Sequence, residues 1–110
     1  MILIADAGAT KIQWVVIHDG KATHPTETAG FNPYFMEPKV LVDAVEKDLV
    51  PFISPAHIKQ IFYYGAGCST MQKCNIVDDV LRDIFEHADI EIHHDLLGAA
   101  RALFGKTTGI

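Results

Sequence analysis

Three short segments of the sequence are rich either in small residues or in polar side chains, and each directly follows an apolar run. They are residues 6–11, 65–68 and 93–95. In open α/β sheets, ligands collect beyond the carboxyl ends of the parallel strands, where the loops after the strands meet. Because all three segments occupy such positions, we expect them to converge on one site.

The first segment has residue types that suit a phosphate group and a magnesium ion. The small residues Gly8 and Ala9 let backbone amides approach an anion closely, and Thr10 adds a hydroxyl. Asp6, at the strand end, can hold magnesium through water. The same residues also suit an ordinary hairpin turn in which Asp6 binds its own loop, so both interpretations stay open. The turn is not a P-loop, because no G-x-x-x-x-G-K pattern is present.

Two other polar residues can act on a hydroxylated substrate. Asp95 follows an apolar strand and begins a helix, so it can accept a hydroxyl proton during phosphoryl transfer, although an aspartate there is also a favourable N-cap. Asn32 can present its amide, which is both donor and acceptor, to a polyol. We expect Trp14, Tyr34 and Phe35 to pack in the core or against their loop, and not to stack on a sugar.

Composition and charge exclude several classes of protein. The chain has 110 residues, of which 49% are hydrophobic and 21% charged, as expected for one globular domain. Its net charge of −5 gives no electrostatic reason to expect nucleic acid or an anionic membrane as partner. The first residues lack the basic and apolar regions of a signal peptide, and no stretch is long enough to span a bilayer, so we expect a cytoplasmic location.

The cysteines and histidines do not predict a metal centre. Two cysteines, Cys68 and Cys74, are too few for a disulfide framework or a four-thiolate zinc site. We expect them to be small apolar residues in or near the core. The adjacent His93 and His94 point to opposite faces of a strand, so their rings cannot readily close on one ion.

The apolar pattern predicts the element order β-β-β-α-β-α-β-α. Strands are expected at residues 2–5, 12–17, 21–28, 61–64 and 89–93, with a two-residue hairpin turn at Asp19 and Gly20. Helices are expected over residues 40–52, from a cap at Ser69 or Thr70 to residue 88, and from Asp95 to residue 103. The first strand is apolar on both faces and belongs near the centre. The prediction is a five-stranded mixed sheet with helices on its faces, the ribonuclease H-like arrangement.

Four motifs carry a family resemblance that covers essentially the whole chain. They are I-L-I-A-D-A-G-A-T-K at residues 2–11, G-x-N-P at 30–33, Y-G-A-G-C at 64–68 and H-D-L-L-G-A-A-R-A-L at 94–103. The first resembles the first phosphate-binding segment of the sugar kinase, actin and Hsp70 superfamily. Within it, the chain is most similar to the N-acetylglucosamine kinase and BadF/BadG/BcrA/BcrD ATPase family.

This resemblance implies a role for each motif in an enzyme that uses ATP and magnesium. Asp6 would bind magnesium through water, and Asp95 would deprotonate the acceptor hydroxyl. Asn32 would hold sugar hydroxyls. The transferred phosphate would contact Gly8, Ala9 and Thr10, assisted by Lys11, and the sugar cleft would be lined by Gly65, Ala66, Gly67 and Cys68.

The function implied is the amino-terminal half of a kinase of an amino sugar, either N-acetylglucosamine or glucosamine. The second domain of the family, which completes the nucleotide site, is absent from this chain, so we expect the chain alone not to turn over. We also expect the cleft face to be an apolar patch that supports self-association as a homodimer. Two alternatives stay open: an ATPase activator of a 2-hydroxyacyl-CoA dehydratase, and a non-catalytic module that binds a sugar or a protein. The activator would need cysteines at a shared iron–sulfur site, so the positions of Cys68 and Cys74 favour the kinase.

Overall fold

The protein is a mixed α/β structure built on one mixed sheet. The computed structural model describes residues 1–8, 10–23, 25–65 and 71–93. The strands are β1 (Ile2–Ala7), β2 (Lys11–His18), β3 (Lys21–Ala22), β4 (Thr26–Ala29), β5 (Gln60–Gly65) and β6 (Asp89–His93). The helical elements are α1 (Pro38–Ala44), η1 (Val45–Leu49), η2 (Val50–Phe52), η3 (Pro55–His57) and α2 (Met71–Ile84).

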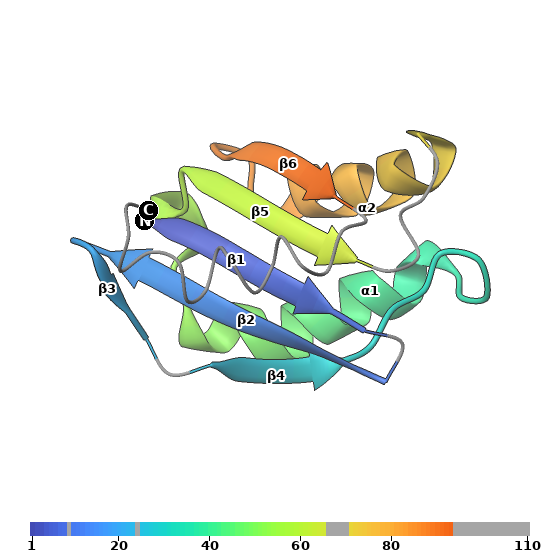
Figure 1. Ribbon diagram of the computed structural model, residues 1–110, viewed down its shortest axis with the longest axis horizontal. Helices are drawn as coiled ribbons and strands as arrows, with labels where there is room; N and C mark the ends of the chain where they lie inside the picture. The colour runs from blue at the N-terminus through green and yellow to red at the C-terminus, as the bar shows by residue number, and fades with distance from the viewer. Residues whose placement is uncertain (9, 24, 66–70, 94–110) are drawn as a thin grey trace.

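Strand β1 lies in the middle of the sheet, as its apolar run predicts. The strand order is β3-β2-β1-β5-β6, and β4 also pairs with β2. Strand β1 is antiparallel to β2 and parallel to β5, which is in turn parallel to β6. The carboxyl ends of β1, β5 and β6 therefore lie along one edge of the sheet, which we call the carboxyl edge (Figure 1).

The prediction of one strand over residues 21–28 is wrong, because the structure has two strands there, β3 and β4. Both pair with β2, so the described part of the chain forms a sheet of six strands and not five. Pro25 lies between them and has no backbone N–H for the ladder, which explains the interruption. The predicted hairpin turn is confirmed: Asp19 and Gly20 have φ values of 53° and 77°, as a type I′ turn requires.

Helices α1 and α2 cover one face of the sheet, which we call the helix face (Figure 1). The helix predicted over residues 40–52 begins earlier, at Pro38, whose fixed φ suits the first helical turn. It also changes geometry, since α1 continues as the π-helical η1 and the 3₁₀ turn η2. Pro51 lies in this last turn and cannot donate the backbone hydrogen bond that a regular α-helix needs there.

The second helix and the last strand are close to expectation. Helix α2 ends at Ile84, and the buried Phe85 and Ala88 continue its apolar face beyond the helix. Strand β6 has the predicted bounds. The predicted caps at Ser69 and Thr70, and the helix from Asp95 to residue 103, lie outside the described residues. Among the described helices, none combines the length and the apolar character needed to cross a bilayer.

Trp14 connects the edge strand β4 to the core. Its side chain is 1% exposed, and its Nε1 donates a hydrogen bond of 2.9 Å to Oγ1 of Thr28, the buried residue of β4. Its ring centroid lies 6.1 Å from that of Tyr63 on β5. The expectation that Trp14 packs in the core is thus confirmed. A single buried hydrogen bond joins the side chains of β2 and β4 beneath the helical layer.

Thr28→Val should destabilise the protein by about 1–3 kcal/mol, because valine keeps the shape of threonine but leaves the buried Trp14 N–H without an acceptor. The free energy of unfolding, measured by denaturant titration, checks this. Thr26→Val is the matched control, as it makes the same change at a less buried position of the same strand. An equal effect of the two substitutions would contradict the assignment.

Candidate functional site

Asp6 belongs to a row of four polar side chains that crosses the sheet near its carboxyl edge. Asp6 is the register partner of Gln13 on β2 and of Tyr64 on β5, and Tyr64 is the partner of His93 on β6. Register partners project from the same face of a sheet. Ile4, Val15 and Phe62 each lie two residues from the polar row along their strands, on the same face of the sheet. They belong to a hydrophobic cluster that is separate from the main core against the helices. The polar row therefore lies on the face opposite the helix face.

Two members of the polar row, Tyr64 and His93, pack against each other. The rings of Tyr64 and His93 are stacked, with centroids 5.2 Å apart and an interplanar angle of 19°. Nε2 of His93 also lies 3.8 Å from Oε1 of Glu91. Gln13 was not among the residues predicted from the sequence, although it is a polar residue inside the apolar run from Ile12 to Ile17, and that pattern is a signal for it.

The connection between β1 and β2, which we call the Gly8 turn (residues 8–11), is tight. The amide of Gly8 donates a hydrogen bond of 2.9 Å to the carbonyl oxygen of Lys11. A Cβ on Gly8 would lie only 3.3 Å from that oxygen, so the close approach favours glycine. The turn therefore has a hairpin hydrogen bond, which uses the Gly8 amide, while Thr10 is exposed at its tip.

The segment that carries Asn32 packs directly against this turn. We call residues 30–36 the Asn32 loop. The amide of Gly30 donates to the carbonyl oxygen of Thr10 at 3.1 Å, and the amide of Phe31 donates to that of Gly8 at 3.2 Å. Two backbone hydrogen bonds thus bring the predicted phosphate segment and the predicted sugar-binding residue side by side.

The side chain of Asn32 has a defined orientation. It is half-buried, and its Oδ1 accepts a hydrogen bond of 2.9 Å from the amide of Tyr34. Its carbonyl oxygen accepts from Phe35 and Met36 at 3.1 and 3.0 Å. Because Oδ1 is engaged within the loop, Asn32 is set up to act on a ligand chiefly through the two N–H donors of its amide.

Lys11, the last residue of the Gly8 turn, provides a positive charge there. Its Nζ lies 3.2 Å from Oε1 of Glu27 on β4, and both side chains are more than half exposed. Exposed ion pairs of this kind contribute about 0–1 kcal/mol, so little free energy opposes the exchange of Glu27 for an anionic ligand.

The described residues contain part of the predicted site. Gly65 is buried at the end of β5, where it is the register partner of Ala7. Asp6, Gly8, Thr10, Lys11, Asn32 and Gly65 all lie at or beside the carboxyl edge. Ala9, Ala66, Gly67, Cys68 and Asp95 lie outside the described residues, as does His94. In the described ranges, no three His, Cys, Asp or Glu side chains gather as direct ligands of a metal ion.

The aromatic residues of the Asn32 loop differ from expectation. Phe35 is 84% exposed and Tyr34 is 48% exposed, so the prediction that they pack in the core or against their loop is wrong for Phe35. Phe35 lies in the connection between β4 and α1 and belongs to neither hydrophobic cluster of the described residues. The prediction for Cys74 is confirmed, because it is half-buried and packs against the core.

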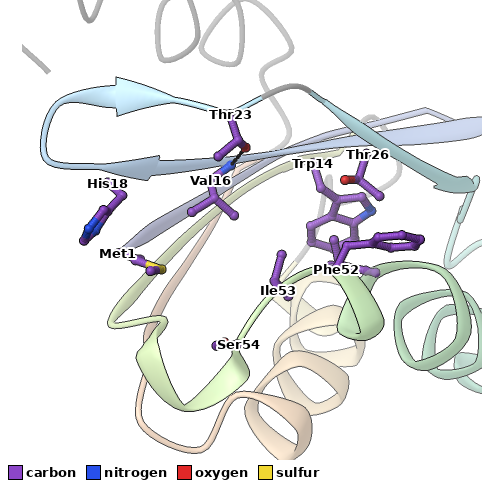
Figure 2. A pocket seen from close by; sticks show the side chains of 10 residues that line it. Met1, Trp14, Val16, His18, Thr23, Thr26, Phe52, Ile53 and Ser54 are labelled. Carbon is purple, nitrogen blue, oxygen red and sulfur yellow. Dashed lines mark hydrogen bonds between the residues drawn. The ribbon is translucent and has the colours of Figure 1, made fainter.

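A separate hollow of about 450 Å³ lies at the other end of the sheet (Figure 2). It is open between β2, the edge strands and η2. Its lining is mostly apolar, and its polar side chains are three hydroxyls and one imidazole; the lining residues are Met1, Trp14, Val16, His18, Thr23, Thr26, Leu49, Phe52, Ile53 and Ser54. Since none of these described lining residues carries a carboxylate or amide side chain, we place the candidate site at the carboxyl edge.

Gly8→Ala should lower the free energy of unfolding by about 1 kcal/mol, because the added methyl group crowds the Lys11 carbonyl and displaces the turn. Hydrogen exchange of the Phe31 amide should also accelerate, since its acceptor is Gly8. Gly20→Asn is the control: it lies in the other hairpin turn, where no atom is within 4 Å of an added Cβ and asparagine tolerates a positive φ. Unchanged exchange at Phe31 would contradict the coupling of turn and loop.

Comparison with known proteins yields a solved structure that covers nearly the whole chain. No protein-family model matches the sequence, and no curated protein matches it either. A crystal structure from Porphyromonas gingivalis, provisionally described as an N-acetylglucosamine kinase, matches 96% of this chain with a TM-score of 0.81 and 36% identity. The chain spans 38% of the length of that protein, in its amino-terminal part. The resemblance predicted from the sequence is therefore confirmed: the chain is similar to the amino-terminal part of an N-acetylglucosamine kinase-type protein.

Proposed function

We propose that this chain forms the amino-terminal part of a cytoplasmic sugar kinase, which transfers the γ-phosphoryl group of ATP to a hydroxyl of an amino sugar. The observation that carries the proposal is the pair of hydrogen bonds between the Gly8 turn and the Asn32 loop, which brings phosphate-type and sugar-type groups together. The similarity to a protein described as an N-acetylglucosamine kinase favours N-acetylglucosamine or glucosamine as the acceptor.

The fold that suits this function is the ribonuclease H-like fold of actin-like ATPase domains. Supporting it are the central β1, the antiparallel β2 and the parallel β5 and β6. In this arrangement the carboxyl edge would face a second domain of similar fold, and the nucleotide would lie between the two.

The surroundings of Asp6 fit a magnesium ion held through water. Magnesium keeps several of its waters and needs only one or two carboxylates, with substrate phosphates completing its shell. Asp6 is a half-buried carboxylate at the carboxyl edge and has no ion-pair partner among the described residues. When bound, magnesium would neutralise charge on the phosphate oxygens during transfer. The role of Asp6 is to fix where that charge is neutralised.

The other residues would position the acceptor and move its proton. The Asn32 amide would donate to a sugar hydroxyl oxygen, while the exposed Thr10 hydroxyl and Lys11 would contact the transferred phosphate. Asp95 would accept the proton of the attacking hydroxyl. The bond from the sugar oxygen to the γ-phosphorus forms as the bond from that phosphorus to the β,γ-bridging oxygen breaks, and ADP leaves.

Neither alternative has comparable support. An activator of a dehydratase would need cysteines available for a shared cluster, and Cys74 packs against the core on α2. A non-catalytic binding module would bind amino sugar but would transfer no phosphoryl group. A calorimetric titration with amino sugar, together with an assay for ADP release, separates this module from the kinase.

Asp6→Asn in the full-length protein should lower kcat by about 100-fold or more, because the neutral amide no longer holds the cation that stabilises the transferring phosphoryl group. Steady-state kinetics over a range of magnesium concentrations check this. Asp19→Asn is the matched control: it makes the same change in the β2–β3 turn at the opposite end of the sheet, where asparagine tolerates the φ of 53°. Wild-type kcat in Asp6→Asn would rule out the assigned role.

Asp95→Asn should reduce kcat by about 10²- to 10⁴-fold and leave the KM for sugar nearly unchanged, since the amide cannot accept the hydroxyl proton. The measurement is steady-state turnover in the full-length protein at saturating ATP and sugar. Asp83→Asn, an exposed change on α2, serves as control. If kcat is unchanged in Asp95→Asn, Asp95 is not the base.

A further inference from the structure

The Asn32 loop has a second attachment, to the first turn of α2. Nζ of Lys73 lies 4.9 Å from the ring centroid of Tyr34, within the range of a cation–π interaction. Lys73 is half-buried, and the Tyr34 ring is 48% exposed. The contact joins the helix that follows β5 to the loop that follows β4.

Tyr34 also determines the orientation of Asn32. Its backbone N–H is the donor to Oδ1 of Asn32 at 2.9 Å. Holding the Tyr34 ring therefore restrains the backbone amide that fixes the Asn32 side chain. When this hydrogen bond is made, the Asn32 nitrogen faces away from the loop as a donor.

The two attachments act on opposite sides of Asn32. On one side, Phe31 is hydrogen-bonded to the Gly8 turn. On the other, Tyr34 lies against Lys73. Asn32 is thus held between the phosphate segment and α2. The Lys73 contact therefore adds an attachment on the Tyr34 side of Asn32 to the hydrogen bond on its Phe31 side.

We propose that Lys73 is a positioning residue which, through the Tyr34 ring, orients the Asn32 amide as a hydrogen-bond donor to a hydroxyl of the sugar. The inference rests on the proposed function and adds to it a determinant of sugar affinity. Lys73 itself touches neither the sugar nor the phosphate. Its effect should therefore appear in the KM for sugar, and not in kcat or in the KM for ATP.

The test compares Lys73→Met, Lys73→Arg and Tyr34→Leu in the full-length protein. Methionine keeps the length of the side chain and removes the charge, whereas arginine retains a cation that can lie over the ring. Loss of the contact should raise the KM for N-acetylglucosamine or glucosamine about two- to fivefold in Lys73→Met, with recovery in Lys73→Arg. Lys59→Met, at the opposite end of the sheet, is the control and should leave the KM unchanged.

A double-substitution cycle tests whether Lys73 acts through Tyr34. The double variant Lys73→Met/Tyr34→Leu should raise the KM for sugar no more than Tyr34→Leu alone. Additive effects would overturn the proposal, as would an unchanged KM in Lys73→Met or a change confined to kcat.

A second readout does not depend on kinase activity. In protein labelled with ¹⁵N-asparagine, the side-chain amide signals of Asn32 should shift in Lys73→Met and return towards their wild-type positions in Lys73→Arg. Unshifted signals would overturn the positioning role whatever the activity. If the wild-type protein has no sugar kinase activity, the proposed function fails, and these signals still decide whether Lys73 orients Asn32.

Discussion

The parallel pairing of β1 with β5 is the constraint on which the rest of the site depends. Its register sets Asp6 beside Tyr64 and Ala7 beside Gly65, so the two strands end at the same edge of the sheet. A shift of one residue would turn Asp6 towards the buried helix face, and Leu3 and Ala5 away from it. The free energy of burying those apolar side chains therefore also fixes the position of the carboxylate. In this way, packing of the core and placement of the site are decided by one register.

The site next depends on how β4 is held, because β4 leads directly into the Asn32 loop. The hydrogen bond from Trp14 to Thr28 joins β4 to β2 inside the core. Two residues later the backbone bonds from Gly30 and Phe31 reach the Gly8 turn. These contacts are made by main-chain groups, which most residue types can supply, together with one buried side-chain pair. The geometry of the Asn32 loop is consequently coupled to the stability of β4 at the side of the sheet.

Much of this could be predicted from local sequence, and the remainder depended on tertiary contacts. Period-two alternation placed β6 at Asp89–His93, and Asp19 with Gly20 identified the hairpin turn, because each pattern reflects backbone geometry. The position of the ends of β1, β5 and β6 along one edge followed from topology alone. The division into β3 and β4 at Pro25 had a local cause that the prediction of one strand overlooked. The contact of Lys73 with Tyr34 had no local signal, since it joins a loop and a helix distant in sequence.

The same distinction explains why Asn32 is better defined than its sequence motif suggests. Asn-Pro is common in loops and by itself indicates only a turn. Here Oδ1 of Asn32 accepts a hydrogen bond from the Tyr34 amide, and its backbone carbonyl accepts hydrogen bonds from two more amides. The acceptor atoms of Asn32 are therefore engaged within the loop, whereas its side-chain N–H groups can donate to a ligand. A hydroxyl ligand would accept a hydrogen bond from this residue without a rearrangement of the loop. The conformational entropy of the loop is lost when the protein folds and not when the ligand binds. With the Gly8 turn attached to the same loop, the backbone would set the distance between the proposed acceptor and phosphate sites, which is the preorganisation that phosphoryl transfer requires.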